Sequence, residues 1–362
     1  MVRLRRTDRR HNKGFHIDSG ALPHVTSGCG IVRSLHPLPV ERPIRMRAAL
    51  FTGSQQEPLL EETDVPVPTP GNGEILIQVY AAGVTHTELL WYPTTHTREG
   101  GSRLHAIPGH EFSGVVTGLG AGITGFSVGD AIFGMNDWFL DGGTAEYCVA
   151  AASSIAPKPA HLTHAEAAAV PIDALTAWQG LVDRAKLQTG ERVLVHGAAG
   201  AVGVFVVQLA RLRGAKVIAT ASGGNMEFVA QLGAQRVIDY RTEAFEDEVQ
   251  DVDVVFDTIG GETLQRSWKV LKSGGRMVTI VEDTSPSSDD PRAKDAFFIV
   301  EPKQEQLIGI GKLLDEGRLL VFVDAEVPFA NASAAYARQV KRNLGHGKVV
   351  IVMPVNGSGG QG

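Results

Sequence analysis

The second half of the chain alternates short apolar runs with longer stretches whose apolar residues recur at helical spacing. The runs, which predict strands, stand at 192–197, 216–221, 236–240, 252–260 and 276–281. The stretches between them, which predict helices, stand at 201–214, 225–233 and 263–275. Continuous apolar strands that alternate with helices are typical of a parallel sheet covered on both faces. This half therefore predicts an α/β fold built on a doubly wound parallel sheet.

The first half has a different pattern, in which apolar and β-branched residues are bounded by closely spaced glycines and prolines. Such segments predict short strands with many turns, because frequent glycines break helices. The strands are expected at 46–51 and 73–84, and within the glycine-rich stretches 112–135 and 142–159. This half therefore predicts a compact, loop-rich β region.

One alanine-rich stretch, 163–182, predicts a helix between the two halves. Thr163 can cap its start, since Glu166 stands three residues further on, and Pro171 should break or kink it. Further along, the apolar pattern predicts a strand at 296–302, a helix that ends near residue 316 and a last strand at 348–353.

The two ends of the chain differ from the rest. Residues 1–45 hold nine lysine or arginine residues against three acidic ones and show no sustained period. They predict a disordered basic leader, or an upstream start codon with the functional protein beginning at Met46. An organellar transit peptide, which is typically arginine-rich and poor in acids, is the alternative. Residues 356–362, rich in glycine, predict a disordered tail.

Composition and charge argue against several classes of function. The chain has 362 residues and a net charge of −6, which does not favour a nucleic-acid binder. Two cysteines are too few for a disulfide framework, and the spaced pairs of a structural zinc site are absent, so a reducing cytoplasm fits best. No apolar run approaches the roughly 18 residues that span a membrane.

The stretch "VLVHGAAGAVG" carries the strongest chemical signal. Its glycines follow a predicted strand, open a predicted helix and repeat with the spacing G-x-x-G-x-x-G, a variant of the dinucleotide fingerprint. Glycines there allow a tight turn, a close approach of backbone N–H groups to a pyrophosphate and close packing of the helix on the sheet. The predicted loop comprises Gly197, Ala198, Ala199, Gly200, Ala201, Val202 and Gly203.

The residues after the second predicted strand of the parallel sheet indicate whether NAD or NADP is the cofactor. NAD sites usually present a carboxylate there to the ribose, whereas "ATASGGN" holds no acid and so permits the 2′-phosphate of NADP. No arginine or lysine stands in the loop either. Neutral hydrogen bonds are expected from Ser222, Asn225 and Tyr240, and NADPH is the favoured cofactor.

Several motifs together resemble one family. "VLVHGAAGAVG", "LTAWQGL" (175–181), "FDTIGG" (256–261), "PGHEFSGVV" (108–116) and "GKVV" (347–350) resemble the medium-chain dehydrogenase/reductase superfamily, and within it the quinone oxidoreductase, or zeta-crystallin-like, branch. The resemblance implies a GroES-like catalytic domain, formed by 46–170 and 320–355, around a Rossmann domain at 171–319. It also implies that Thr176 lies near the nicotinamide, and Thr258 joins the expected cofactor-binding residues.

The resemblance also allows the zinc ligands of the superfamily to be checked position by position. Zinc-dependent members use a cysteine, the histidine of "GHE" and a second cysteine. Here these positions hold Thr85, His110 and Ile172. A catalytic zinc ion needs three protein ligands, so no metal is expected, and His110 and Glu111 should be buried polar residues bonded to the backbone or to each other. A rearranged site that uses His86, His96, His105 or Asp173 is the alternative.

Without a metal ion, oxidation of an alcohol is difficult, whereas an electrophilic acceptor needs little activation. The expected reaction is hydride transfer from NADPH to a quinone or an α,β-unsaturated carbonyl, with Thr85 and Glu88 as candidate catalytic residues. The expected substrate is a small molecule that Trp91, Tyr92, Trp138 and Phe139 could contact. A zinc-containing alcohol dehydrogenase and a silent nucleotide-binding redox sensor are the rival hypotheses. A homodimer formed through the strand at 296–302 is also expected, with no nucleic-acid or membrane partner.

Overall fold

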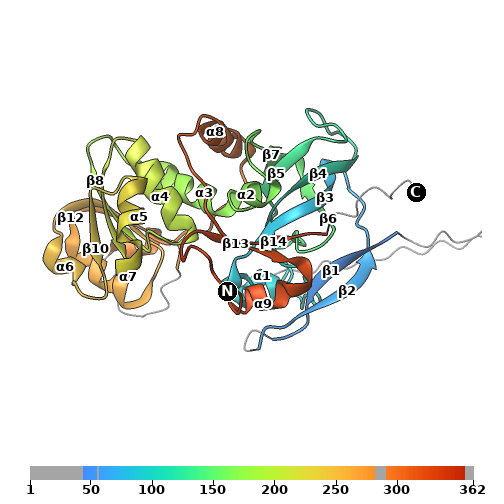
Figure 1. Cartoon of the computed structure of the whole chain (residues 1–362), viewed down its shortest axis with the longest axis horizontal. Helices are drawn as coiled ribbons and strands as arrows, with labels where there is room; N and C mark the ends of the chain where they lie inside the picture. The colour runs from blue at the N-terminus through green and yellow to red at the C-terminus, as the bar shows by residue number, and fades with distance from the viewer. Residues whose placement is uncertain (1–43, 55–56, 282–290, 355–362) are drawn as a thin grey trace, which may run out of the picture. The chain divides into compact units, whose positions relative to one another are not determined.

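The computed structural model describes residues 44–54, 57–281 and 291–354, which are coloured in Figure 1. The predictions for the tail, and for all of the leader except its last two residues, lie outside these ranges. Arg45 is the exception among the charged leader residues, because it already belongs to the first strand. In the described residues no helix is long and apolar enough to cross a membrane.

A largely antiparallel sheet forms in the first half of the chain, where the glycine-rich pattern predicts a loop-rich β region. Its order within the described residues is β13-β14-β3-β4-β5-β7, with β6 paired to β3 and with β13 and β14 parallel to each other. The strands are β3 (Glu74–Gly83), β4 (Glu111–Leu119), β5 (Ala131–Met135), β6 (Tyr147–Ala151), β7 (Ile155–Pro157), β13 (Val323–Pro328) and β14 (Lys348–Val352). A separate hairpin pairs β1 (Arg45–Phe51) with β2 (Leu60–Pro66). The chain thus returns to its first half to complete this sheet.

A parallel sheet forms the second half, in the order β10-β9-β8-β11-β12. Its strands are β8 (Arg192–His196), β9 (Lys216–Ala221), β10 (Arg236–Asp239), β11 (Val252–Asp257) and β12 (Leu271–Thr279). All four pairings are parallel, and β11 is buried along its whole length. The strand order reverses at β8, and ligands of such sheets bind beyond the carboxyl ends of the strands at that point. The predicted doubly wound sheet is confirmed.

Helices connect the strands and cover the sheets. The α-helices are α1 (Tyr92–Thr95), α2 (His164–Ala168), α3 (Pro171–Trp178), α4 (Ala201–Leu212), α5 (Met226–Leu232), α6 (Phe245–Glu248), α7 (Gly261–Ser267), α8 (Gln304–Asp315) and α9 (Ala332–Tyr336). The π-helical segment η3 (Gln179–Arg184) follows α3, and the 3-10 turns are η1 (His86–Leu90), η2 (Ala152–Ser154), η4 (Gly223–Asn225), η5 (Trp268–Val270), η6 (Pro291–Asp295) and η7 (Phe329–Asn331). Figure 1 shows α4 and α5 against the parallel sheet.

The predicted helix 163–182 forms as two helices with a break at the proline. The Thr163 hydroxyl accepts from Glu166 N at 3.1 Å, and the Glu166 carboxylate accepts from Thr163 N at 2.8 Å, so both donors of this end are satisfied. The first helix ends at Ala168, and Pro171 opens the second, where its missing N–H costs nothing.

Two sequence predictions are wrong in this half. The helix expected at 263–275 ends much earlier, because β12 already starts at Leu271 and pairs with β11. The segment 296–302 makes only a bridge from Phe297 to Thr279 rather than a strand. The backbone of this segment forms hydrogen bonds with side chains instead. Trp138 donates to the Val300 carbonyl, and Gln179 bonds both the N–H and the carbonyl of Glu301.

Candidate active site

The glycine loop lies between β8 and α4, where the strand order reverses. Gly197 adopts a φ of +71°, and Gly200 N donates to its carbonyl at 2.9 Å, which closes the turn. A Cβ on Gly203 would lie 2.1 Å from the Gly197 oxygen, so only glycine lets α4 start this close to the strand. The first N–H groups of α4 have no partner within the helix, as at the start of any α-helix. This cradle fits the pyrophosphate of a dinucleotide.

The loop after β9 carries two of the predicted cofactor residues. The Asn225 amide donates to Ser222 Oγ at 3.3 Å and to the Gly345 carbonyl at 3.4 Å, so the segment before β14 approaches this loop. Tyr240 follows β10 and is 57% exposed, free to meet a ligand. Sequence reasoning missed Asp239 on the neighbouring strand, whose carboxylate would lie 2.8 Å from a Cβ on Gly223. That charge acts against a 2′-phosphate.

Below the glycine loop, two polar residues hold the turns. The Asp257 carboxylate accepts from Ile259 N at 3.1 Å and Gly260 N at 3.0 Å, and thereby shapes the loop that carries Thr258. The Thr258 hydroxyl donates to the His196 carbonyl at 2.9 Å. Burial lowers the pKa of His196 to about 3, so its ring is neutral and structural at pH 7.

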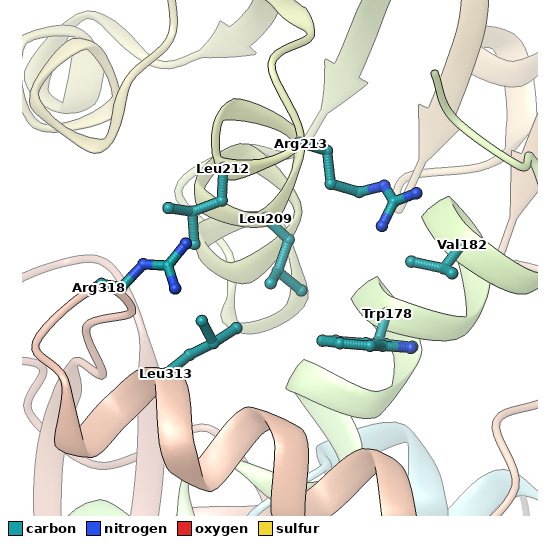
Figure 2. Close-up of a pocket in the computed structure, with 7 residues that line it drawn as sticks. All are labelled: Trp178, Val182, Leu209, Leu212, Arg213, Leu313 and Arg318. Carbon is teal, nitrogen blue, oxygen red and sulfur yellow. The ribbon is translucent and has the colours of Figure 1, made fainter. Parts of the chain in front are cut away.

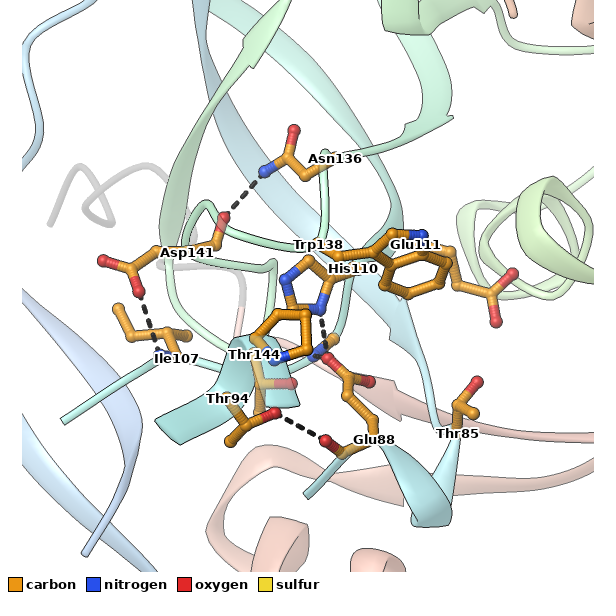
Figure 3. Close-up of polar contacts among 12 residues, drawn as sticks. Thr85, Glu88, Thr94, Ile107, His110, Glu111, Asn136, Trp138, Asp141 and Thr144 are labelled. Carbon is orange, nitrogen blue, oxygen red and sulfur yellow. Dashed lines mark hydrogen bonds and ion pairs between the residues drawn. The ribbon is translucent and has the colours of Figure 1, made fainter. Parts of the chain in front are cut away.

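Glu88 and His110 form a buried pair next to β4 (Figure 3). One Glu88 oxygen contacts His110 Nδ1 and accepts from Gly109 N at 2.8 Å. His110 Nε2 lies 3.0 Å from the Leu140 carbonyl, which only accepts, so this nitrogen carries a hydrogen and donates. Both ring nitrogens of His110 are therefore engaged by protein groups. His110 and Glu111 are buried, as expected, and of the two kinds of partner expected for them, the backbone or each other, both residues bond the backbone: His110 at the Leu140 carbonyl and Glu111 at Ile172 N.

Glu111 belongs instead to a second buried cluster, centred on Lys348 at the start of β14. The Lys348 ammonium contacts the Glu111 carboxylate, lies 3.1 Å from Asp173 Oδ2 and donates to the Thr85 hydroxyl at 3.2 Å. The other Glu111 oxygen accepts from Ile172 N at 3.0 Å. The exposed fractions of Lys348, Glu111 and Asp173 are 4%, 0% and 3%. Three charges are thus withdrawn from water, and Thr85 is their half-buried neighbour.

Burial and mutual attraction shift the titration of this cluster. Burial raises the pKa of Glu111 to about 7 and also raises the pKa of Asp173, while Lys348 pulls both back down. Burial alone would lower the pKa of Lys348, but the two carboxylates outweigh it and raise that pKa. Lys348 is therefore charged at pH 7, and it is the cation that makes two buried carboxyl groups tolerable here.

The three superfamily zinc positions do not form a ligand set. Thr85 and Ile172 offer a hydroxyl and an aliphatic side chain, and both nitrogens of His110 are occupied. Two of the four alternative ligands are used elsewhere, since His96 stacks on Tyr92 and Asp173 pairs with Lys348. Across 44–54, 57–281 and 291–354, no three histidine, cysteine, aspartate or glutamate side chains are grouped to hold a metal ion. The residues present do not fit zinc.

Of the four aromatic residues expected to contact the substrate, Trp138 lies next to His110, and Trp91 lies next to Trp138. The Trp138 ring is 5.3 Å from the His110 ring and 5.0 Å from that of Trp91, edge to face. Tyr92 stacks on His96, and Phe139 packs under the Arg98 guanidinium. Trp91 and Trp138 therefore remain the candidates for contact with a flat acceptor.

Thr176, the other residue predicted near the cofactor, is buried in α3. Its hydroxyl donates to the Ile172 carbonyl at 2.6 Å, one helical turn back, so it keeps only lone pairs for a ligand. A cavity of about 160 Å³ lies elsewhere, between α3, α4 and α8 (Figure 2). It is lined by Trp178, Val182, Leu209, Leu212, Arg213, Leu313 and Arg318, none of which belongs to the predicted site.

Two family models match the chain. A model described as an alcohol dehydrogenase GroES-like domain matches residues 71–160, and one described as a zinc-binding dehydrogenase matches residues 232–351. The second range contains none of the three zinc positions discussed above. Its description therefore carries no information about whether this chain holds the metal.

Relatives cover most of the chain. A probable zinc-binding oxidoreductase, mitochondrial, from Arthroderma benhamiae is 33% identical over 81% of this chain and 92% of its own length. A 2-methylene-furan-3-one reductase from Solanum lycopersicum is 33% identical over 85% of this chain and 79% of its own. The solved structure of a quinone oxidoreductase from Coxiella burnetii superposes with a TM-score of 0.74 at 28% identity, over 85% and 99% of the two chains. The GroES-like and Rossmann-like architecture is thereby shown.

Proposed function

Because the chain belongs to the medium-chain dehydrogenase/reductase superfamily, in its quinone oxidoreductase-like branch, we propose that it reduces quinones or α,β-unsaturated carbonyls with NADPH and without zinc. The observation that carries the proposal is the engagement of both His110 nitrogens, with Thr85 and Ile172 where zinc ligands would stand. The names of two relatives, a furanone reductase and a quinone oxidoreductase, support this substrate class.

The bound cofactor would supply the hydride, and the protein's own residues bind and orient the reactants. The glycine loop and the start of α4 would hold the pyrophosphate, with Ser222, Asn225 and Tyr240 at the adenosine end. Thr85 would offer a hydroxyl to the acceptor oxygen as it gains charge, and Trp91 and Trp138, whose rings pack edge to face, would contact the acceptor. Glu88 acts through His110 and Gly109, whose positions it fixes, and so it is a positioning residue.

The preference for NADPH rests on the acid-free loop Ser222–Asn225, while Asp239 acts against it. The direct test measures oxidation of NADPH and NADH in parallel across a panel of quinones, enones and aldehydes, and reduction of NADP⁺ by alcohols. We expect turnover with NADPH and a quinone or an enone. Cofactor binding without turnover on any acceptor would instead identify a silent nucleotide-binding protein, and turnover only with alcohols would identify an alcohol dehydrogenase.

We further propose that the protein is a homodimer, paired at the edge of the parallel sheet next to β12. Ile299 is 61% exposed in the segment that bridges to Thr279, and a second copy would cover it. Sedimentation at micromolar concentration should give twice the chain mass, and I299D should give the monomer. A monomeric wild-type protein would contradict this proposal. A cytoplasmic location likewise remains our proposal, to be tested by cell fractionation.

A further inference from the structure

The register of the antiparallel sheet brings Lys348 to Thr85. Strand β14 pairs with β3 through Val350↔Gly83 and Ile351↔Ala82, and Val84 N donates to the Val349 carbonyl at 2.9 Å. Continued two residues beyond Val350, this register sets Lys348 directly opposite Thr85. Opposite residues of an antiparallel pair have neighbouring side chains. The contact of 3.2 Å between Lys348 Nζ and Thr85 Oγ1 is therefore a consequence of the sheet itself.

The donors and acceptors of this cluster fix the direction of the Thr85 hydroxyl. An ammonium group has three N–H donors and accepts nothing. Lys348 meets three oxygen-bearing groups, those of Glu111, Asp173 and Thr85. The Thr85 oxygen must accept from Lys348, so its own hydrogen points elsewhere, and no acceptor for it occurs in the part of the chain that the structure describes.

The exposure of the four residues indicates that the Thr85 hydroxyl hydrogen points toward solvent. Lys348, Glu111 and Asp173 are at most 4% exposed, whereas Thr85 is half-buried and is the member of the four that reaches solvent. A cation directly behind a hydroxyl polarises its O–H bond, which makes it a stronger donor in a water-poor site. The cluster thus presents its positive charge to a ligand through one O–H group.

Resting on the proposed function, we propose that Lys348 is a positioning residue that holds Thr85 as a hydrogen-bond donor, so that the site takes its substrate by a carbonyl oxygen. Charge on this oxygen grows as hydride arrives at carbon, and the polarised hydroxyl stabilises it. The O–H then donates to the enolate or quinol oxygen, and solvent supplies the proton that completes the product. A Thr85 hydroxyl that donates to the substrate oxygen favours reduction of quinones and enones over oxidation of alcohols.

A mutant cycle tests whether Lys348 acts through Thr85. T85V removes the donor and T85S keeps it, while K348M combined with D173N removes the cation without changing the net charge. We expect T85V to lower kcat on the order of 100-fold with a nearly unchanged KM, and T85S to stay within a few-fold of wild type. K348M/D173N should lower kcat in the Thr85 protein but have little further effect on T85V, with D173N alone as the control.

A second readout does not depend on turnover. Difference infrared spectra of a bound enone should show a C=O stretch lowered relative to the free enone, with the shift lost in T85V and reduced in K348M/D173N. If wild type turns over but T85V matches it in both rate and C=O stretch, the inference is wrong while the proposed function stands. If no acceptor is reduced but the stretch shift and its loss are seen, the inference stands and the proposed function fails. T85V decides these outcomes even if the lysine variant does not fold.

Discussion

Replacing Gly203 by alanine is expected to weaken NADPH binding by at least about 100-fold, or about 2.8 kcal/mol. The new Cβ would lie 2.1 Å from the Gly197 oxygen and 2.7 Å from Ala198 Cα, both of them backbone atoms. The start of α4 must therefore move away from the loop, and the N–H groups that would meet the pyrophosphate move with it. Titration of the protein fluorescence with NADPH measures the loss.

Gly309 provides the matched control for this substitution. It lies in α8, outside the proposed cofactor site, and a Cβ there would meet only the Trp178 ring at 3.7 Å, an ordinary van der Waals contact. G309A should bind NADPH within a few-fold of wild type. Equal affinity of G203A and wild type would show that the glycine loop is only a tight turn without a role in cofactor binding.

Replacing Lys348 by methionine is expected to destabilise the fold by about 3–5 kcal/mol at pH 8, because two buried carboxyl groups lose their cation. The loss should be smaller at pH 5. The pKa of Glu111 is already raised to about 7 with the cation present, and it rises further without it, so the folded protein binds a proton that the unfolded chain releases above about pH 4.5. Stability of the variant therefore falls as pH rises.

Urea unfolding at the two pH values measures this difference, and Lys312 offers the control. Its side chain is 77% exposed and 3.9 Å from Glu316, so K312M should change the free energy of unfolding by less than about 0.5 kcal/mol at either pH. A K348M loss that is equally small, or that is larger at pH 5 than at pH 8, would show that the cluster is not held by its cation.

The glycine loop could be predicted from the sequence because its signal is local. A strand, three glycines and a helix stand within one short stretch, and each constrains the others. Pro171 is a similar case, since a proline's effect on a helix depends on the residue itself. The parallel sheet also followed from local apolar runs, whereas β2 and β13 were missed because their residues alternate weakly between apolar and polar.

The charge cluster could not be predicted in the same way. Lys348 lies far from Thr85, Glu111 and Asp173 in the chain, and the register between β14 and β3 brings them together. The only indication in the sequence was the lysine of "GKVV", which stands at the start of an apolar strand where a buried charge would need a partner. Asp239 could not be predicted for a related reason. It stands at the end of β10, and its carboxylate approaches Gly223 in the loop after the adjacent strand, β9.

The central claim is that this chain reduces a carbonyl acceptor without a metal ion. The most direct test measures NADPH oxidation with a quinone or an enone, on protein dialysed against a chelator and analysed for zinc by mass spectrometry. We expect undiminished turnover at a zinc content far below one ion per chain. Stoichiometric zinc, with activity that is lost on its removal and restored on its return, would instead show that the protein is a zinc enzyme.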